Sequence, residues 1–282
     1  MLVSVMMLFS SVTGGSSVSQ SAADDYLKAI RSTDFCAHAL GGIDGYSYTN
    51  SKEALEQSYK KGARIFEADI HLTSDGEAVL VHGWRKNDYL YRIGENNYPE
   101  ANKADGSDYV PSYDEFMGFS IMGRYTPMDM KMLADFMREH GDMFVMVDIA
   151  SEDYEGTVRA YKAIVRSCGG DDSVLSHLIT GGHTKDMIAA VKSVYDFKLY
   201  NLYYSDEILS DDLDTDDFIS YCRSEGIQSF SCAEAMYTDE AAKKLKEGGL
   251  ISFVYTINDE DKADRIIAMG ADIVGSDHIQ RY

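Results

Sequence analysis

The chain has 282 residues, 45% of them hydrophobic, so it is long enough to bury a substantial core. Its formal net charge of −21 repels nucleic acid and anionic bilayers, because both bind basic surfaces. The charge therefore argues against a nucleic-acid partner and favours diffusible or zwitterionic ones. After the amino-terminal segment no stretch approaches the ~20 apolar residues of a membrane helix, so we expect no stable membrane insertion. The sequence leaves the oligomeric state open.

The amino-terminal segment is apolar from Leu2 to Phe9 and then rich in Ser, Gly and Val as far as Ala23. This pattern is similar to the apolar region and small-residue cleavage zone of a secretory signal peptide. No basic residue precedes the apolar run, and the first one in the chain is Lys28. We therefore expect residues 1–23 to be an atypical or truncated signal peptide and the protein to be secreted or extracytoplasmic.

Apolar runs typical of strands alternate along the rest of the chain with segments of helical periodicity. The expected helices cover residues 52–61, 128–140, 154–167, 184–195, 214–224, 238–247 and 259–268. The expected barrel strands lie near 34–38, 64–70, 143–149, 176–180, 198–204, 227–231, 250–256 and 272–276, with 78–82 as an extra hairpin arm. Alternating strands and helices predict a parallel sheet, and a chain of more than about 250 residues suits a closed TIM (β/α)₈ barrel. We expect one domain over residues 24–282.

Residues 83–127 interrupt the alternation. They are rich in Tyr, Asn, Gly and Asp and contain all three prolines of the chain, Pro99, Pro111 and Pro127. Loops of this length inside a compact domain are usually functional or disordered. We expect a lid over a substrate site, with a passive surface loop as the alternative. Trp84, at the base of the segment, is expected either to pack on the substrate or to anchor the loop.

Two histidines and two carboxylates lie close together early in the chain. His38 closes the first expected strand, Glu67 and Asp69 lie two apart on the next, and His82 ends the hairpin arm. Residues two apart on a strand face the same side. An Asp-Gly pair at 75–76 favours a tight hairpin turn, and a turn centred there would bring His82 level with Asp69, roughly 5 Å across the ladder.

These residue types suit phosphodiester cleavage. Two oxygen ligands on one face favour a hard cation, Ca²⁺ or Mg²⁺, over Zn²⁺. One imidazole can accept a proton near pH 7 while a second donates one to a leaving oxygen. Each residue taken alone is more often structural, so the hypothesis rests on the combination.

The order of these residues resembles the glycerophosphodiester phosphodiesterase family, which is similar in fold and chemistry to phosphatidylinositol-specific phospholipase C. The family shows a His-Arg-Gly strand, a Glu-Asn-Thr turn, Glu-x-Asp, Thr-x-Asp-Gly and Val-x-x-His-Asp. The chain has, in the same order, Ala37-His38-Ala39, Thr49-Asn50-Ser51, Glu67-x-Asp69, Thr73-Ser74-Asp75-Gly76 and Val79-x-x-His82. Weaker matches lie at 144–150, 254–258 and 270–277.

The resemblance implies a role for each matching residue. His38 and His82 would be the general acid/base pair, and Glu67, Asp69 and Asp148 would bind the metal. A hydroxyl of the substrate would attack phosphorus and form a cyclic phosphate. Water would then open this cyclic phosphate. Asn50 would brace the loop beside His38. The candidate substrate-binding residues are Asn50, Trp84 and Tyr255.

The chain departs from the family at four positions. Ala39 stands for an Arg that meets the phosphate, Ala150 for a Lys, Gly83 for an Asp, and Asp148 for a longer Glu. Replacement charge could come from Arg85, Lys86 or Lys131.

Three functions remain open on these grounds. The first is a metal-dependent phosphodiesterase that converts glycerophosphodiesters to glycerol phosphate and an alcohol. The second is a non-catalytic protein on the same fold that binds phosphoglycerol or sugar phosphate. The third is a phospholipase C or D acting on an intact phospholipid.

Overall fold

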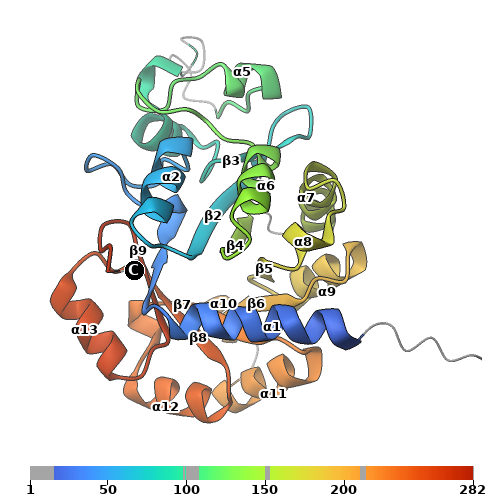
Figure 1. Cartoon of the computed structure of the whole chain (residues 1–282), viewed down its shortest axis with the longest axis vertical. Helices are drawn as coiled ribbons and strands as arrows, with labels where there is room; N and C mark the ends of the chain where they lie inside the picture. Colours follow the sequence, from blue (N-terminus) through green and yellow to red (C-terminus); the bar gives the residue numbers. More distant parts are fainter. Residues whose placement is uncertain (1–15, 98, 100–107, 150–152, 210–213, 282) are drawn as a thin grey trace, which may run out of the picture.

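A closed barrel of eight parallel strands forms the centre of the protein (Figure 1). The computed structural model describes residues 16–97, 99, 108–149, 153–209 and 214–281. The strands follow the order β1-β9-β8-β7-β6-β5-β4-β2, and β2 pairs with β1 to close the ring. The predicted TIM (β/α)₈ barrel is therefore confirmed. Its strands are β1 (Phe35–Ala37), β2 (Ile65–Leu72), β4 (Phe144–Ile149), β5 (Leu178–Gly182), β6 (Leu199–Tyr203), β7 (Ser229–Ala233), β8 (Ile251–Tyr255) and β9 (Ile273–Ser276).

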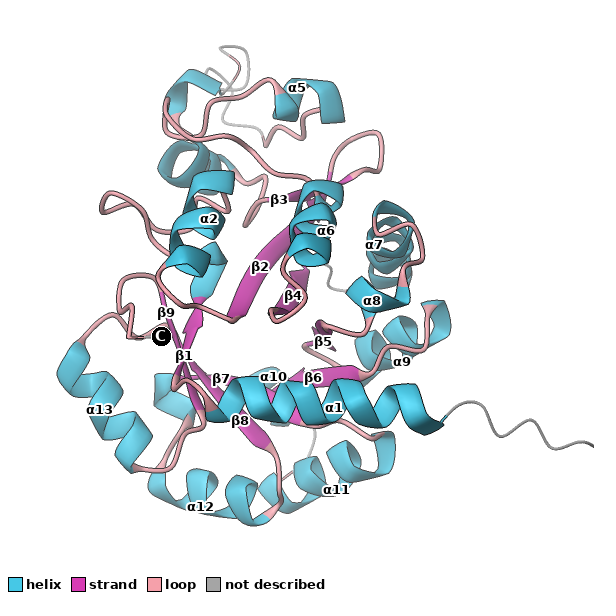
Figure 2. Ribbon diagram, viewed as in Figure 1, coloured by secondary structure: helices cyan, strands magenta, loops and turns pink. Residues whose placement is uncertain are grey.

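Helices surround the barrel (Figure 2). Each of the seven predicted helices is present, and each begins at a Ser, Thr or Asp whose side chain accepts a hydrogen bond from a backbone N–H of the first turn. These residues made the helix starts recognisable in the sequence. The helices are α2 (Lys52–Lys60), α6 (Met130–Glu139), α7 (Tyr154–Ser167), α9 (Lys185–Val194), α11 (Thr215–Glu225), α12 (Asp239–Glu247) and α13 (Glu260–Ala268), and shorter turns are α8 (Asp172–Leu175), α10 (Asp206–Leu209) and η4 (Glu234–Met236).

The hairpin arm is present, but its predicted register is wrong. β3 (Ala78–Leu80) pairs antiparallel with β2. The turn holds three residues, because the N–H of Thr73 donates to the carbonyl of Glu77 at 3.0 Å, and Gly76 takes the φ of +84° that such a turn needs. A two-residue turn was expected. The extra residue shifts the register by one, so His82 does not lie opposite Asp69 but follows the end of β3.

Helix α1 (Ser16–Arg31) was not predicted. Figure 1 shows it lying across the barrel. Its buried Tyr26 and Ile30, one turn apart, pack among residues of the early part of the strands, including Ile65 and Phe144. The helix thus closes the amino-terminal end of the barrel. Of the predicted signal peptide, residues 1–15 lie outside the described residues and 16–23 form the first half of α1.

Side chains inside the barrel change from apolar to acidic along the strands. Ile65 and Phe144 are buried at the amino-terminal end, and Met146 follows two residues later on β4. Glu67 and Asp69 continue the same face of β2 toward the carboxyl end, as strand alternation requires. The carboxyl ends of the strands are where TIM barrels carry their active sites, so the acidic layer lies at the expected mouth.

The described parts of the segment 83–127 form short helices whose buried side chains join the main hydrophobic core. These parts contain α3 (Lys86–Asp88), η2 (Tyr89–Ile93), η3 (Glu95–Asn97) and α5 (Tyr113–Met117). Trp84, Tyr89 and Phe116 are buried and in ring contact, with Trp84 touching both of the others. Figure 2 shows this segment at one end of the molecule, next to β3. Its predicted action as a lid stays a prediction. Among the described helices, none is long and apolar enough to cross a membrane.

Candidate active site

Three carboxylates meet at the mouth of the barrel. Glu67 and Asp69 project from β2, and Asp148 projects from β4 directly opposite Asp69 in the parallel register. Ligand oxygens of the three side chains lie within 4.8 Å of one another. Glu67 and Asp69 are buried and Asp148 is half-buried. The sequence prediction that these three residues form one group agrees with this arrangement.

The carboxylates repel one another in a largely buried site. Burial raises the pKa of Glu67 well above its usual value, and the charge of Asp69 adds to the shift. Burial also raises the pKa of Asp69, with His82 opposing the shift and Asp148 adding to it. Within the described part of the chain, Glu67 Oε1 is buried without a hydrogen-bond partner. An all-oxygen group with a free, buried ligand atom fits a hard divalent cation.

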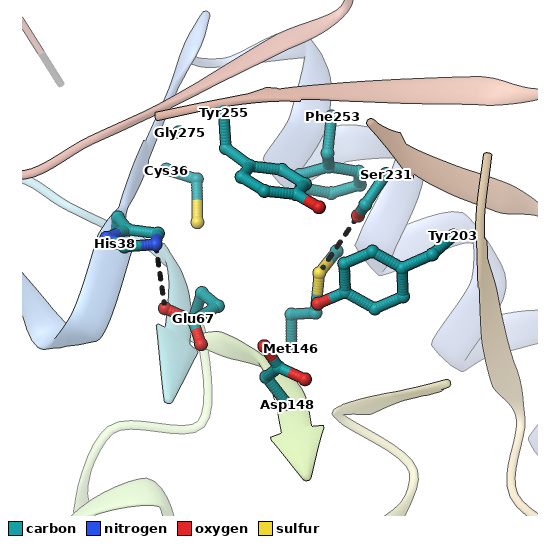
Figure 3. Close-up of a pocket in the computed structure, with 10 residues that line it drawn as sticks. All are labelled: Cys36, His38, Glu67, Met146, Asp148, Tyr203, Ser231, Phe253, Tyr255 and Gly275. Carbon is teal, nitrogen blue, oxygen red and sulfur yellow. Dashed lines mark hydrogen bonds and ion pairs between the residues drawn. The ribbon is translucent and has the colours of Figure 1, made fainter. Parts of the chain in front are cut away.

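His38 lies beside this cluster and is held by a second carboxylate. It begins the turn η1 (His38–Leu40) after β1, rather than ending the strand as expected. Its Nδ1 lies 2.8 Å from Asp277 Oδ1, and its Nε2 lies 3.8 Å from Glu67 Oε2 (Figure 3). Burial alone lowers the pKa of His38, but the charge of Glu67 and the bond to Asp277 outweigh burial and raise it to about 9. Asn258 donates to the other oxygen of Asp277 at 2.8 Å.

The backbone after His38 takes an unusual path. Ala39, Leu40 and Gly41 all have positive φ. A side chain at Gly41 would place its Cβ 2.2 Å from Ser58 Oγ, so only glycine fits there. This turn directs the N–H of Ala39 to Glu67 Oε2, at 2.6 Å. The Ala-His-Ala-x-Gly-Gly opening thus orients both the imidazole and one carboxylate.

The ring of Tyr48 contacts both histidines. Its centroid is 4.7 Å from that of His38 and 5.2 Å from that of His82, edge to face in both cases. His82 is half-buried, and its Nδ1 lies 3.4 Å from Asp88 Oδ1. The structure therefore brings both predicted catalytic histidines to the same mouth, although by a loop and not by the strand ladder.

A hollow lined partly by aromatic side chains adjoins the carboxylates. Tyr255 lies parallel to His38, with ring centroids 6.5 Å apart, so it stands where a substrate-binding residue was expected. His183 stacks on Tyr203 at 3.9 Å and its Nε2 lies 3.5 Å from Asp148 Oδ1. Figure 3 shows the lining residues: Cys36, His38, Glu67, Met146, Asp148, Tyr203, Ser231, Phe253, Tyr255 and Gly275.

Two predicted substrate-binding residues have other contacts. Asn50 is fully buried, and its amide group donates to Asp69 Oδ2 at 2.8 Å while its oxygen accepts from the N–H of Asp69 at 3.2 Å. It holds a carboxylate rather than a substrate. Trp84 is buried in the 83–127 segment and its indole N–H donates to the carbonyl of Leu72 at 2.9 Å. This geometry fits the alternative that Trp84 anchors the loop.

Sequence reasoning missed Asp277, Asn258 and Tyr48. The first two lie at the ends of strand motifs whose match was noticed, and a carboxylate closing the last strand was the available signal. Tyr48 gave no signal, because it lies in an irregular loop with a φ of +57°. Of the expected replacement cations, Lys131 pairs with Asp135 at 2.7 Å on the exposed face of α6. Ala150 lies outside the described residues.

The sequence from 42 to 167 matches the model of the glycerophosphoryl diester phosphodiesterase family. The matched range includes all three carboxylates and His82 and begins just after His38. A comparison with curated proteins finds no match.

Solved structures share the fold over most of their length. A Silicibacter pomeroyi protein assigned as a glycerophosphoryl diester phosphodiesterase has a TM-score of 0.72 at 16% identity, covering 90% of this chain and 94% of its own. An Oleispira antarctica phosphodiesterase in complex with the product sn-glycerol-3-phosphate has a TM-score of 0.67 at 16% identity (89% and 96%). The Thermotoga maritima glycerophosphodiester phosphodiesterase has a TM-score of 0.62 at 16% identity (88% and 96%).

At these identities the structural likeness establishes the barrel, and the sequence match is confined to residues 42–167. The match covers the segment in which both strands of the carboxylate cluster and the second histidine lie. Residues 42–167 therefore resemble the glycerophosphoryl diester phosphodiesterase family, and the chain as a whole shares the barrel of solved structures that carry that name.

Proposed function

We propose that this protein is a metal-dependent phosphodiesterase that hydrolyses glycerophosphodiesters to glycerol phosphate and an alcohol. One observation carries the proposal: three carboxylates and two imidazoles converge at the mouth of one barrel, and both imidazoles contact the same tyrosine. The Oleispira antarctica relative holds sn-glycerol-3-phosphate, which is the kind of product expected here.

Glu67, Asp69 and Asp148 would hold the metal ion. Their ligands are all oxygen, which favours Ca²⁺ or Mg²⁺ over softer metals. Such an ion would supply positive charge to phosphate oxygens when bound. Asn50 keeps Asp69 in place through two hydrogen bonds, and the N–H of Ala39 does the same for Glu67. The chain's own contribution is thus a preorganised set of ligands.

His38 and His82 would move the protons. A bond forms between phosphorus and a hydroxyl oxygen, from the substrate or from water, and one imidazole accepts the proton of that hydroxyl. The bond between phosphorus and the alcohol oxygen breaks, and the other imidazole donates a proton to that oxygen. Where the substrate's own hydroxyl attacks, water then opens the cyclic phosphate. The bond to Asp277 fixes the ring of His38 during these steps.

The aromatic hollow would receive part of the substrate. Tyr255 and Tyr203 stand opposite Glu67 and Asp148, with ring centroids 5.9 Å apart (Figure 3). Rings in such positions pack against the apolar atoms of a bound alcohol or glycerol. We propose Tyr255 as a substrate-binding residue on this ground.

Hydrolysis assays test the proposal. Purified protein is incubated with glycerophosphocholine, glycerophosphoglycerol or glycerophosphoinositol, first with Ca²⁺ or Mg²⁺ and then with a chelator. Release of glycerol phosphate that stops on chelation supports the proposal. No turnover despite tight metal binding would favour a binding protein or an enzyme for intact phospholipid.

Substitution of each histidine tests the acid/base pair. His38→Ala and His82→Ala should each lower kcat by at least about 10²-fold, the usual contribution of a positioned proton donor or acceptor. His140→Ala is the matched control, because His140 stacks on Tyr59 outside the site. Near-normal activity in either site variant would remove that histidine from the mechanism.

We also propose that residues 1–23 direct export of the protein. The support is the apolar run followed by small residues. Sequencing the amino terminus of protein recovered from the culture medium tests this proposal. A mature chain that begins near residue 24 supports it, and uncleaved protein confined to the cytoplasm contradicts it.

A further inference from the structure

A phosphate-binding site usually contains Arg or Lys side chains. The matched motifs of this chain provide neither. A phosphodiester is an anion, and proteins usually hold phosphate with charge-assisted hydrogen bonds from Arg or Lys. Ala39 stands where the family resemblance implies an arginine, and it is fully buried, with its N–H already engaged by Glu67. A guanidinium from another part of the chain could take that place.

Arg92 lies beside the histidines although it belongs to the 83–127 segment. Its guanidinium carbon is 3.9 Å from the centroid of the Tyr48 ring, and that ring contacts both His38 and His82. The side chain is 16% exposed. Arg92 comes from η2, a turn of π-helix, and such turns are frequent at functional sites. The stacking on Tyr48 holds the guanidinium plane in one orientation.

Two nitrogens of this guanidinium lack a hydrogen-bond partner among the described residues. Nε and Nη1 are buried, and neither forms a hydrogen bond within the part of the chain that the structure describes. Nη1 lies 3.4 Å from Asp88 Oδ1, which is longer than the usual charge-assisted bond of about 2.7–2.9 Å. Buried polar groups without partners are rare, because leaving one unpaired costs stability. The guanidinium is therefore held in one orientation and pairs only loosely with Asp88, and two of its buried nitrogens form no hydrogen bond among the described residues.

Asp88 ties this cation to the second histidine. Its Oδ1 lies 3.4 Å from His82 Nδ1 and 3.4 Å from Arg92 Nη1. Because both nitrogens approach the same oxygen, they lie no farther apart than twice that distance. A phosphate carries several acceptor oxygens, so one bound next to both groups can accept from each of them. Asp88 thus acts as a positioning residue for His82 and Arg92.

We propose that Arg92 binds the substrate's phosphate and takes the place of the cation that is missing at Ala39. This inference rests on the proposed phosphodiesterase function and adds a residue from the 83–127 segment to its substrate site. The segment then contributes directly to recognition of the anion. The competing explanation is that Arg92 only supports Tyr48.

Binding of sn-glycerol 3-phosphate measured by titration calorimetry in the presence of Ca²⁺ tests the assignment. Glycerol, which lacks the phosphate, is the ligand control. Arg92→Gln should weaken binding of glycerol 3-phosphate by about 10- to 100-fold, as expected for loss of a charge-assisted contact. The affinity of Arg92→Lys should lie between those of the unsubstituted protein and Arg92→Gln, because lysine keeps the charge but not the planar fork. In the assay with glycerophosphocholine, KM should be lowest for the unsubstituted protein, higher for Arg92→Lys and highest for Arg92→Gln.

Arg124→Gln is the matched control variant. Arg124 also lies in the 83–127 segment and loses the same charge, but it is 58% exposed and pairs with Asp44. Its affinity for glycerol 3-phosphate should stay within about twofold of the unsubstituted protein, as for other exposed ion pairs. If Arg92→Gln does not fold, Arg92→Lys carries the comparison.

The outcomes separate the two proposals. Unchanged affinity in folded Arg92 variants, with or without a lower melting temperature, overturns the role of Arg92 even if the enzyme is active. Binding of glycerol 3-phosphate that depends on Arg92 in a protein without any turnover supports the phosphate site and contradicts the proposed hydrolysis. Failure of the unsubstituted protein to bind glycerol 3-phosphate overturns the inference.

Discussion

Asp277 determines how His38 faces the site. Its carboxylate accepts from the imidazole at 2.8 Å and is itself held by the amide of Asn258 at 2.8 Å. Both partners of this pair are buried, so the hydrogen bond has little competition from water. A histidine held through Nδ1 presents Nε2, the nitrogen nearer Glu67, to a substrate.

Asp277→Asn should lower kcat by about 10²-fold or more while the protein stays folded. An amide can donate to Nδ1 as well as accept from it, so the variant loses the charge that stabilises an imidazolium and permits the wrong tautomer. Steady-state hydrolysis of glycerophosphocholine and a thermal melt give the two readouts. Asp264→Asn is the control, because Asp264 is exposed and pairs with Arg281 on the surface. Unchanged kcat in Asp277→Asn would show that the bond is purely structural.

The three carboxylates predict a stabilising effect of metal. Burial, with repulsion from the neighbouring carboxylates added to it, raises the pKa of Glu67 and Asp69 in the folded protein, so the fold carries a cost that a bound cation lowers. A ligand present at 100 times its Kd adds about 2.7 kcal/mol to the free energy of unfolding. We therefore expect Ca²⁺ or Mg²⁺ to raise the melting temperature and a chelator to reverse the rise.

Glu67→Gln should abolish that rise. Glu56→Gln, a substitution in an exposed pair with Lys52, should keep it. Differential scanning fluorimetry across a metal titration measures both variants. A rise of equal size in Glu67→Gln would place the metal elsewhere.

Part of this site could be predicted from the sequence because it follows strand alternation. Glu67 and Asp69 lie two apart on a strand, so their shared face was certain once the strand was recognised. The partners that come from turns could not be predicted in the same way. Tyr48 and Arg92 reach the site through positive-φ loops and a π-helical turn, and no periodicity indicates where such a backbone points.

At the scale of elements, the turn length decided the position of His82. One residue more in the hairpin turn moved it out of the predicted register with Asp69, although the hairpin itself was expected correctly. The helix starts were predictable, because a capping side chain fixes each one locally. The register of a strand pair depends on both strands and on the turn between them. It is therefore harder to infer from the sequence of one strand.

The anchoring of the 83–127 segment at Trp84 gives a prediction at this scale. Trp84→Phe keeps most of the ring contacts with Phe116 but removes the hydrogen bond to Leu72, so it should lower the free energy of unfolding by about 0.5–1.5 kcal/mol. KM for glycerophosphocholine should stay within about twofold, because the indole packs in the hydrophobic core against Tyr89 and Phe116. Urea denaturation and steady-state kinetics provide the readouts. A large rise in KM with unchanged stability would return Trp84 to the substrate site.

At the scale of the whole molecule, the residues that stabilise the barrel and the residues of the candidate site lie at opposite ends of the barrel axis. Apolar side chains fill the amino-terminal end beneath α1, and the acidic residues occupy the opposite mouth. The barrel was predictable because eight strands and the helices between them each carry their own pattern. Helix α1 was missed because its sequence was interpreted as a cleavage zone, and its burial depends on a surface formed by strands far along the chain.

Tyr26 tests this separation. Its side chain is 1% exposed and its ring lies 5.2 Å from that of Phe144 at the closed end of the barrel. Tyr26→Ala should lower the free energy of unfolding by about 3–5 kcal/mol, the usual cost of removing a buried aromatic ring, whereas Tyr26→Phe keeps the ring and should cost less than about 1.5 kcal/mol. At temperatures well below the midpoint, KM and kcat of both variants should match the unsubstituted protein, because the carboxylates and histidines lie at the other end. Urea denaturation measures the first effect and glycerophosphocholine hydrolysis the second. A Tyr26→Ala protein that unfolds at the same urea concentration as the unsubstituted one would mean that α1 does not contribute to closing the barrel in solution.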